Sequence, residues 1–115
     1  MKKSFIPLLS FTFLLAGTLA SIANPVGEVV AAGSATVVRH GPASLTVNQA
    51  TDKVIINWNS FSIGAGELTR FVQPGANASA LNRVLGGNPT AIYGMLQANG
   101  NVYVINPSGI LVGPS

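Results

Sequence analysis

The chain has 115 residues and no cysteine, and its six lysines and arginines face three acidic residues. That length is enough for one small domain, and the missing cysteines exclude a disulfide-stabilised scaffold. Two of the basic residues are Lys2 and Lys3, so the rest of the chain is close to neutral, which argues against a nucleic-acid partner or an anionic membrane surface.

Residues 1–23 have the pattern of a secretory signal peptide. The two lysines are followed by an apolar stretch, and the segment ends in the small-x-small triplet that signal peptidase reads. We predict cleavage after Ala23, with cleavage after Ala20 as the alternative. A membrane-spanning helix is the weaker interpretation, because the apolar run is short and Pro7 interrupts it.

The mature chain, residues 24–115, is predicted to begin with β-strands. Residues 26–40 are small, apolar and β-branched, and we expect them to form a cap at the N-terminal end of a β structure. Residues 44–49 alternate in polarity. This places Leu45 and Val47 on one face, as in a half-buried strand.

Three further segments continue the pattern. Residues 53–57 are a β-branched run of strand length, and residues 67–73 alternate again, with Thr69 and Phe71 on one side. Residues 77–85 fit either a helical turn or a strand followed by a loop, because asparagines and β-branched residues are mixed in them.

Residues 99–113 contain two turns and two strands. Residues 99–100 (Asn-Gly) have the chemistry of a two-residue hairpin turn, and residues 102–105 form a strand. Residues 106–109 (Asn-Pro-Ser-Gly) are a second turn, in which proline presets φ and the Asn106 side chain can bond the backbone two residues on. The strand after this turn has no successor in the sequence, so we expect the front end of a longer β architecture.

Short strands separated by Gly, Pro, Asn and Asp clusters indicate an all-β chain, since no segment keeps a helical period. Corners of this kind let a chain coil. About twenty residues per turn would give roughly four or five rungs, spaced about 4.8 Å apart. In such a coil we expect Ile105 and Ile110 to point inward. The internal repeats are too weak to establish the coil from periodicity alone.

The chain is predicted not to be an enzyme. Its three acids, Glu28, Asp52 and Glu67, lie in separate segments, so the sequence shows no paired carboxylates. Its single histidine, His40, precedes a Gly-Pro turn, where a solvated side chain is the favoured interpretation. The sequence has no glycine-rich phosphate loop and no metal-ligand cluster, and we expect no cofactor.

Four blocks of the sequence stand out together: residues 53–63, 70–74, 80–84 and 98–113. In this order they resemble the secretion domain of two-partner-secretion exoproteins, in the filamentous hemagglutinin and high-molecular-weight adhesin group. The family's hallmark Asn-Pro-Asn-Gly-Ile stands here as Asn106, Pro107, Ser108, Gly109 and Ile110, and the serine keeps a short hydrogen-bonding side chain. The family's second motif, Asn-Pro-Asn-Leu, has no copy. Residues 88–91 come nearest and are given no role.

The resemblance implies a right-handed parallel β-helix with an N-terminal β cap, of which residues 24–115 would be the N-terminal part. It implies a protein of a Gram-negative bacterium that crosses the inner membrane by its signal peptide and meets a dedicated outer-membrane barrel transporter in the periplasm. That transporter's periplasmic domains would recognise this region by adding strands edge to edge. The region would then fold outside the cell, secreted or at the cell surface, and template the β-helix behind it.

The resemblance also points to two sets of residues. The hallmark residues would fix a corner between strands. A second set would serve either the core or transporter recognition: Trp58, Asn59, Phe61, Arg70, Asn82 and Arg83. For the two aromatic residues we favour the core or the space under the cap, and for the two arginines a solvated face.

The family includes virulence-associated adhesins, hemagglutinins, hemolysins and toxins, and host-cell contact would come from downstream sequence. Two other functions stay open for this chain. One is a module that itself binds host glycan or matrix, although aromatic residues and acid clusters are few. The other is a truncated product without function, since the sequence stops shortly after the hallmark residues.

Overall fold

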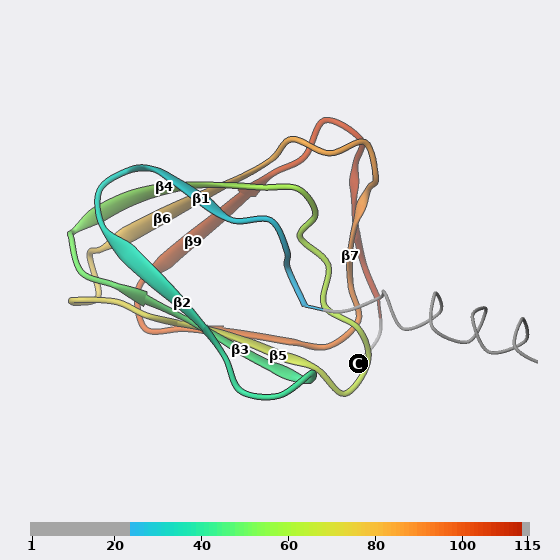
Figure 1. Ribbon diagram of the computed structural model, residues 1–115, viewed down its shortest axis with the longest axis horizontal. Coiled ribbons are helices and arrows are strands. Elements are labelled where there is room, and N and C mark those ends of the chain that lie inside the picture. Colours follow the sequence, from blue (N-terminus) through green and yellow to red (C-terminus); the bar gives the residue numbers. More distant parts are fainter. Residues whose placement is uncertain (1–23, 114–115) are drawn as a thin grey trace, which may run out of the picture.

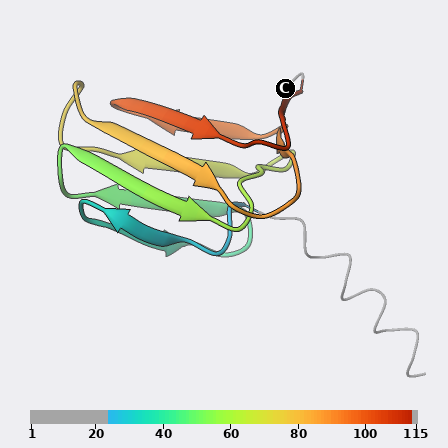
Figure 2. The same cartoon turned by 90° about the horizontal axis from the view of Figure 1, so that it is seen from above.

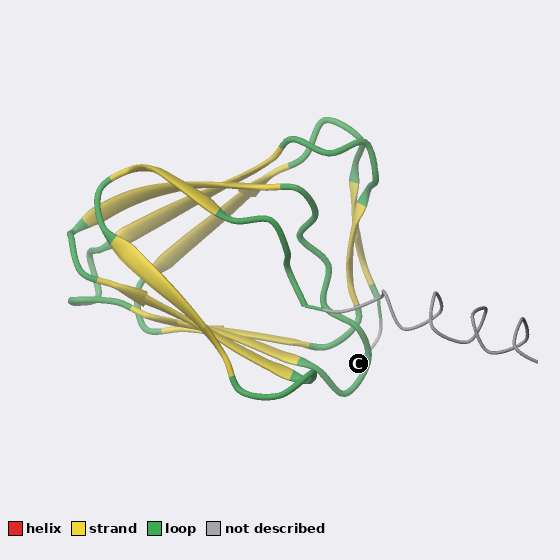
Figure 3. Cartoon of the chain, viewed as in Figure 1, coloured by secondary structure: helices red, strands yellow, loops and turns green. Residues whose placement is uncertain are grey.

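The computed structural model describes residues 24–113, and the predicted signal peptide lies outside these described residues. The described chain contains ten β-strands and no helix, which confirms the all-β prediction (Figure 3). Accordingly, this part of the chain has no helix long and apolar enough to cross a membrane. The strands are β1 (Val29–Ala32), β2 (Ala35–Arg39), β3 (Ser44–Gln49), β4 (Lys53–Trp58), β5 (Leu68–Val72), β6 (Ser79–Val84), β7 (Thr90–Ile92), β8 (Met95–Ala98), β9 (Asn101–Ile105) and β10 (Ile110–Val112).

The strands belong to three sheets, and the chain visits these sheets in turn as it coils. β4, β6 and β9 are neighbours in one sheet, β3, β5 and β8 in a second, and β7 and β10 in a third, always in parallel. Figure 1 shows the sheets as the sides of a triangle, and Figure 2 shows the turns stacked on one another. We call each turn a rung: rung 1 is β3–β4, rung 2 is β5–β7 and rung 3 is β8–β10.

The rungs are longer and fewer than the sequence analysis expected. Thr46 pairs with Arg70 and Arg70 with Gln97, so successive rungs take 24 and 27 residues. The described chain therefore has three rungs after the cap. The prediction was wrong because the corners are extended loops: residues 59–67, for example, separate β4 from β5.

An antiparallel cap covers the first rung. β1 pairs with β4 and β2 with β3, both antiparallel, which places the cap within the predicted residues 26–40. The Arg39 guanidinium holds the cap together by donating to both Glu28 carboxylate oxygens, at 2.9 and 3.0 Å, and to the Pro25 carbonyl at 2.7 Å. The hydrogen bond from Arg39 holds the pKa of Glu28 below its ordinary value.

Alternation along the strands places apolar side chains inside the coil. Leu45 and Val47 of β3 are fully buried, on the face that the sequence predicted. Thr69 and Phe71 of β5, which the sequence placed on one side, are buried together. Trp58 at the end of β4 and Phe61 in the following loop are also fully buried. Their rings meet edge to face with centroids 5.5 Å apart, so the loop after β4 supplies part of the core.

Ile105 does not point inward, and that prediction was wrong. In the parallel register β9 sets Val102 on Ala80 and Ile105 on Arg83, so Val102 faces the core and Ile105 faces out. Half of the Ile105 surface is exposed. The register of β9 on β6, which the sequence does not reveal, decides which alternate set is buried.

Residues 99–100 form a corner of the coil and not a hairpin turn. They connect β8 to β9, which belong to different sheets. The Asn99 side chain bonds both backbone groups of Gln73 in the rung below: its Oδ1 accepts from the amide N at 2.7 Å and its Nδ2 donates to the carbonyl at 2.8 Å. The Gly100 amide donates to the Gln73 side chain at 2.7 Å. This corner is therefore held by contacts to the preceding rung.

Candidate functional site

The hallmark residues form the corner between β9 and β10, which we call the 106–110 corner. The Gly109 amide donates to the Asn106 carbonyl at 3.0 Å, which closes a four-residue turn. The Asn106 Oδ1 accepts from the Ser108 amide at 2.9 Å, the local contact that the sequence suggested. Gly109 has a φ of 109°, a conformation that only glycine adopts without strain.

The 106–110 corner is bound to the loop directly before β7 in the rung below. The Asn106 Nδ2 donates to the Asn88 carbonyl at 3.0 Å and to the Thr90 hydroxyl at 2.9 Å. The Ser108 hydroxyl donates to the Gly87 carbonyl at 3.1 Å. The serine at this hallmark position thus uses its hydrogen-bonding side chain to join two rungs.

Sequence reasoning missed the partner of this corner. Residues 88–89 (Asn-Pro) precede β7 as residues 106–107 (Asn-Pro) precede β10, and β10 lies in register on β7 with Ile110 on Thr90. The repeated dipeptide was a usable signal. Without the register, however, nothing in the sequence indicated that the two copies lie one above the other.

Two of the other candidate residues form a hydrogen-bonded pair inside the coil. The Trp58 indole N–H donates to Asn82 Oδ1 at 2.8 Å, and Asn82 Nδ2 donates to the Tyr103 carbonyl at 3.1 Å. Trp58, Phe61 and Asn82 are all fully buried. In the folded chain these side chains hold rungs together and are not accessible to a partner.

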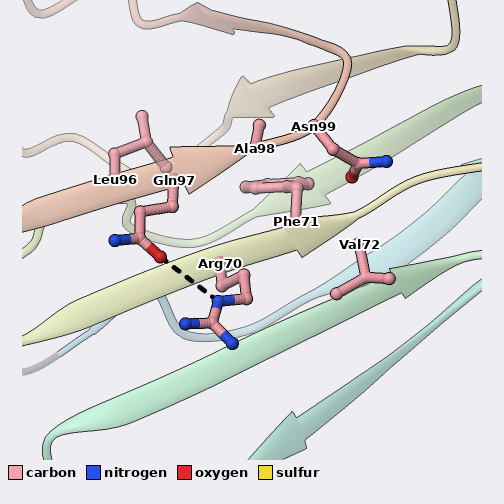
Figure 4. A pocket seen from close by; sticks show the side chains of 7 residues that line it. All are labelled: Arg70, Phe71, Val72, Leu96, Gln97, Ala98 and Asn99. Atoms are coloured by element: carbon pink, nitrogen blue, oxygen red, sulfur yellow. Dashed lines mark hydrogen bonds between the residues drawn. The ribbon is translucent and has the colours of Figure 1, made fainter. Parts of the chain in front are cut away.

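The two candidate arginines lie on the outer faces of different sheets. Arg70 on β5 donates from Nε to Gln97 Oε1 on β8 at 3.2 Å, and Figure 4 shows this contact on the outer face beside a shallow pocket. Arg83 on β6 donates from Nε to Asn57 Oδ1 on β4 at 2.8 Å. The structure therefore does not bring the two arginines into one site.

Asn59 contributes through its backbone, which joins the cap to two rungs. Its amide donates to the Val26 carbonyl at 3.0 Å, and its own carbonyl accepts from the Gly86 amide at 3.1 Å. Within residues 24–113 no three metal-binding side chains gather at one place. The arrangement is thus a stack of interlocked corners whose outer faces carry both polar and apolar side chains.

Comparisons with known proteins agree on one family. A sequence model of the TPS secretion domain matches residues 23–115. The chain is 41% identical over 112 residues to the Heme/hemopexin-binding protein of Haemophilus influenzae strain Rd, and 42% identical over 80 residues to a protein of the same name from Haemophilus influenzae. These alignments cover 96% and 70% of this chain but only 12% and 9% of those proteins.

A solved structure shares the fold. The crystal structure of the HMW1 secretion domain from Haemophilus influenzae is similar with a TM-score of 0.75 and 34% sequence identity. The match covers 80% of this chain and 24% of that one. The chain thus corresponds to about a quarter of that domain.

Proposed function

The chain belongs to the TPS secretion domain family, and from this membership we propose that it directs a larger exoprotein to its outer-membrane transporter and starts the folding of that exoprotein outside the cell. This is a binding and assembly role and not a catalytic one. The observation that carries it is the stack of rungs, which starts at an antiparallel cap and continues in parallel to β8, β9 and β10.

Strand edges supply the chemistry for recognition. In the described part of the chain, β8, β9 and β10 are the last strands of their sheets, and nothing pairs with their outer edges. Unpaired backbone N–H and C=O groups of an edge accept a strand from another chain, with side chains giving selectivity. We propose that the transporter's periplasmic domains bind such an edge before the rung stack grows further.

The cap gives the stack a direction. Antiparallel pairing covers rung 1 on the side of β1 and β2, so new rungs add at the side of β8–β10. The 106–110 corner, bound to the rung below, supplies an ordered surface for the next rung. We propose that the coil is right-handed, as parallel strand connections overwhelmingly are.

The route and the longer parent are part of the same proposal. Membership of the family fits export across the outer membrane, and we propose passage through the periplasm after removal of residues 1–23. Two relatives are named for heme and hemopexin binding. We propose that the parent likewise binds a host ligand, with an adhesin as one form of this, through sequence beyond this chain.

The first experiment measures binding of the full chain to the periplasmic domains of the transporter encoded beside it. Circular dichroism checks that the chain is folded, by its β spectrum. Edge recognition predicts binding that survives Arg70→Ala and Arg83→Ala, since these side chains lie on outer faces. A folded chain that fails to bind would contradict the proposal, and so would normal secretion of a parent that lacks residues 99–113. Reproducible binding to a glycan array would favour a direct host-binding module.

A further inference from the structure

The interior of the coil contains buried amide side chains. Gln49 and Gln73 are 6% and 5% exposed, at the ends of β3 and β5, where the chain leaves one sheet for the next. Among the described residues, every buried side-chain nitrogen or oxygen has a hydrogen-bond partner. These glutamines are therefore hydrogen-bonded, and their partners lie both in the adjacent corner of the chain and in the neighbouring rung.

Gln73 binds the rung above it through both atoms of its amide. Its Oε1 accepts from the Gly100 amide at 2.7 Å, and its Nε2 donates to the Asn101 carbonyl at 3.0 Å. The same Nε2 donates to Gln49 Oε1 at 3.0 Å. The Gln49 side chain is held in place because its own Nε2 donates to the carbonyls of Thr51, Asp52 and Ser79. Gln49 thus fixes the direction in which Gln73 presents its amide.

The position above Gln73 admits only a residue without a side chain. A Cβ built on Gly100 would lie 2.8 Å from the Ala78 carbonyl oxygen, 2.9 Å from the Gly75 carbonyl oxygen and 2.9 Å from Gln73 Oε1, closer than Cβ contacts occur. The φ of Gly100 is not among the positive values, so this glycine is required by space and not by backbone conformation. The residues two positions before and after Gly100 are Ala98 and Val102, and both carry a Cβ.

Alternation of polarity leaves a two-residue slip open. A strand displaced by one residue turns its apolar face outward, but a displacement by two restores inward and outward faces. For β8 and β9, a two-residue slip would set Ala98 or Val102 above Gln73. The Gln73 amide and the carbonyl oxygens of Gly75 and Ala78 occupy the space that either Cβ needs.

We propose that the narrow space above Gln73 sets the axial register of rung 3 by admitting only Gly100. The Gln73 amide, oriented by Gln49, and the carbonyl oxygens of Gly75 and Ala78 bound this space, and it fixes a register that apolar packing alone does not specify. This role concerns the alignment of one rung on the next, so its test does not depend on whether the chain binds the transporter.

Engineered cysteine pairs test the register directly, because the natural chain has no cysteine. Arg70→Cys with Gln97→Cys joins partners of the observed register, on the outer face. Arg70→Cys with Met95→Cys, and Leu68→Cys with Gln97→Cys, report slips by two residues in the two directions. Residues two apart in register lie beyond disulfide reach. The full chain is exported to the oxidising periplasm and the cross-links are identified by peptide mass.

The chain that carries only a cysteine pair is expected to cross-link only the pair of the observed register. With Gly100→Ala added, the observed register no longer places a residue without a Cβ in this space, and cross-linking of one or both slipped pairs is expected to rise at least about tenfold relative to the observed pair, a fold-change within the range of overpacking. Gly75→Ala is the matched control, because a Cβ on Gly75 meets nothing within 4 Å and should leave the pattern unchanged. An unchanged pattern with Gly100→Ala would overturn the proposal.

A measurement on the chain without any substitution covers the case in which Gly100→Ala does not fold. The Gly100 amide donates to a side chain and to no strand, yet it should exchange its hydrogen as slowly as the amides of β8 and β9 on either side of it. Slow exchange would show that the contact between Gly100 and Gln73 persists and would support the proposal. Exchange at the rate of an exposed turn amide would overturn the proposal.

Discussion

Asn106 joins two segments of the chain that lie 18 residues apart. One side chain closes its own turn and also donates to the Asn88 carbonyl and the Thr90 hydroxyl in the rung below. The turn contact was foreseeable because it spans two residues. The contacts to the lower rung were not, because they depend on how many residues one rung consumes.

Replacing Asn106 tests how much this corner contributes. Asn106→Ala removes all three contacts and should lower the free energy of unfolding by about 1 kcal/mol, the scale of a lost hydrogen bond in a tight turn, because two of the contacts are exposed. Chemical denaturation followed by circular dichroism measures it. Secretion of a full-length parent should fall further than this loss implies, because folding outside the cell drives export in the proposed mechanism.

Asn88→Ala is the control for that experiment. It changes the same residue type before a proline, but the Asn88 side chain is exposed and makes no hydrogen bond within the described chain. Its effect should stay within about 0.5 kcal/mol. Equal losses in the two variants would show that the side-chain contacts of Asn106 contribute nothing specific.

The cap has one titratable contact, between Arg39 and Glu28. Arg39 lowers the pKa of Glu28 in the folded chain, so the stabilisation is complete above the unfolded-state value of 4.5 and is lost as the pH falls through the lowered folded value. Unfolding measured from pH 7 to pH 3 should show a stability loss that Glu28→Gln largely removes. Asp52→Asn, which removes a carboxylate from an exposed pair 4.0 Å from Lys53, should leave the loss in place.

At the scale of the elements, strands were easier to predict than corners. Alternation in residues 44–49 and 67–73 separated the two faces of β3 and of β5, because period two is a local property. Ile105 was assigned to the wrong face, because the choice between two alternate sets on β9 is made by its register on β6. The turn at residues 99–100 was assigned to a hairpin, because Asn-Gly has the same local chemistry in both settings.

Gly75 and Gly100, in the corners after β5 and β8, should respond differently to replacement by alanine. Gly100→Ala forces a Cβ against the Gln73 side chain and two backbone oxygens, and should cost about 1–3 kcal/mol by overpacking. Gly75→Ala meets nothing within 4 Å and should be neutral or slightly stabilising. Thermal unfolding of both variants measures the difference. Similar melting temperatures would contradict the close approach seen at Gly100.

For the whole molecule, the sequence identified an all-β chain with its cap but not the number of rungs. Composition and turn residues report strand content directly, whereas rung length is set by loops such as residues 59–67, which have no periodic signal. The family was identified because four blocks kept their order over the mature chain. The candidate residues were divided between core and surface only by the structure.

The rungs are expected to differ in local stability. β3 to β6 contribute most of the fully buried side chains, while every residue of β10 is exposed. Amide hydrogens of β10 should therefore exchange fastest, those of β8 and β9 more slowly, and those of β3 to β6 slowest. Uniform protection throughout the described chain would contradict this order and would indicate a single cooperative unit.

The length of a rung has a consequence for the movement of the chain through a pore. One rung takes 24 or 27 residues, which measure roughly 80 Å or more when extended. Closing that rung lengthens the coil by only about 4.8 Å, the spacing between neighbouring strands. Each closure outside a membrane therefore withdraws a long stretch of polypeptide, and backward sliding would require a complete rung to open. In the proposed mechanism, a coil of this geometry converts its own folding into one-way movement of the chain in steps of one rung.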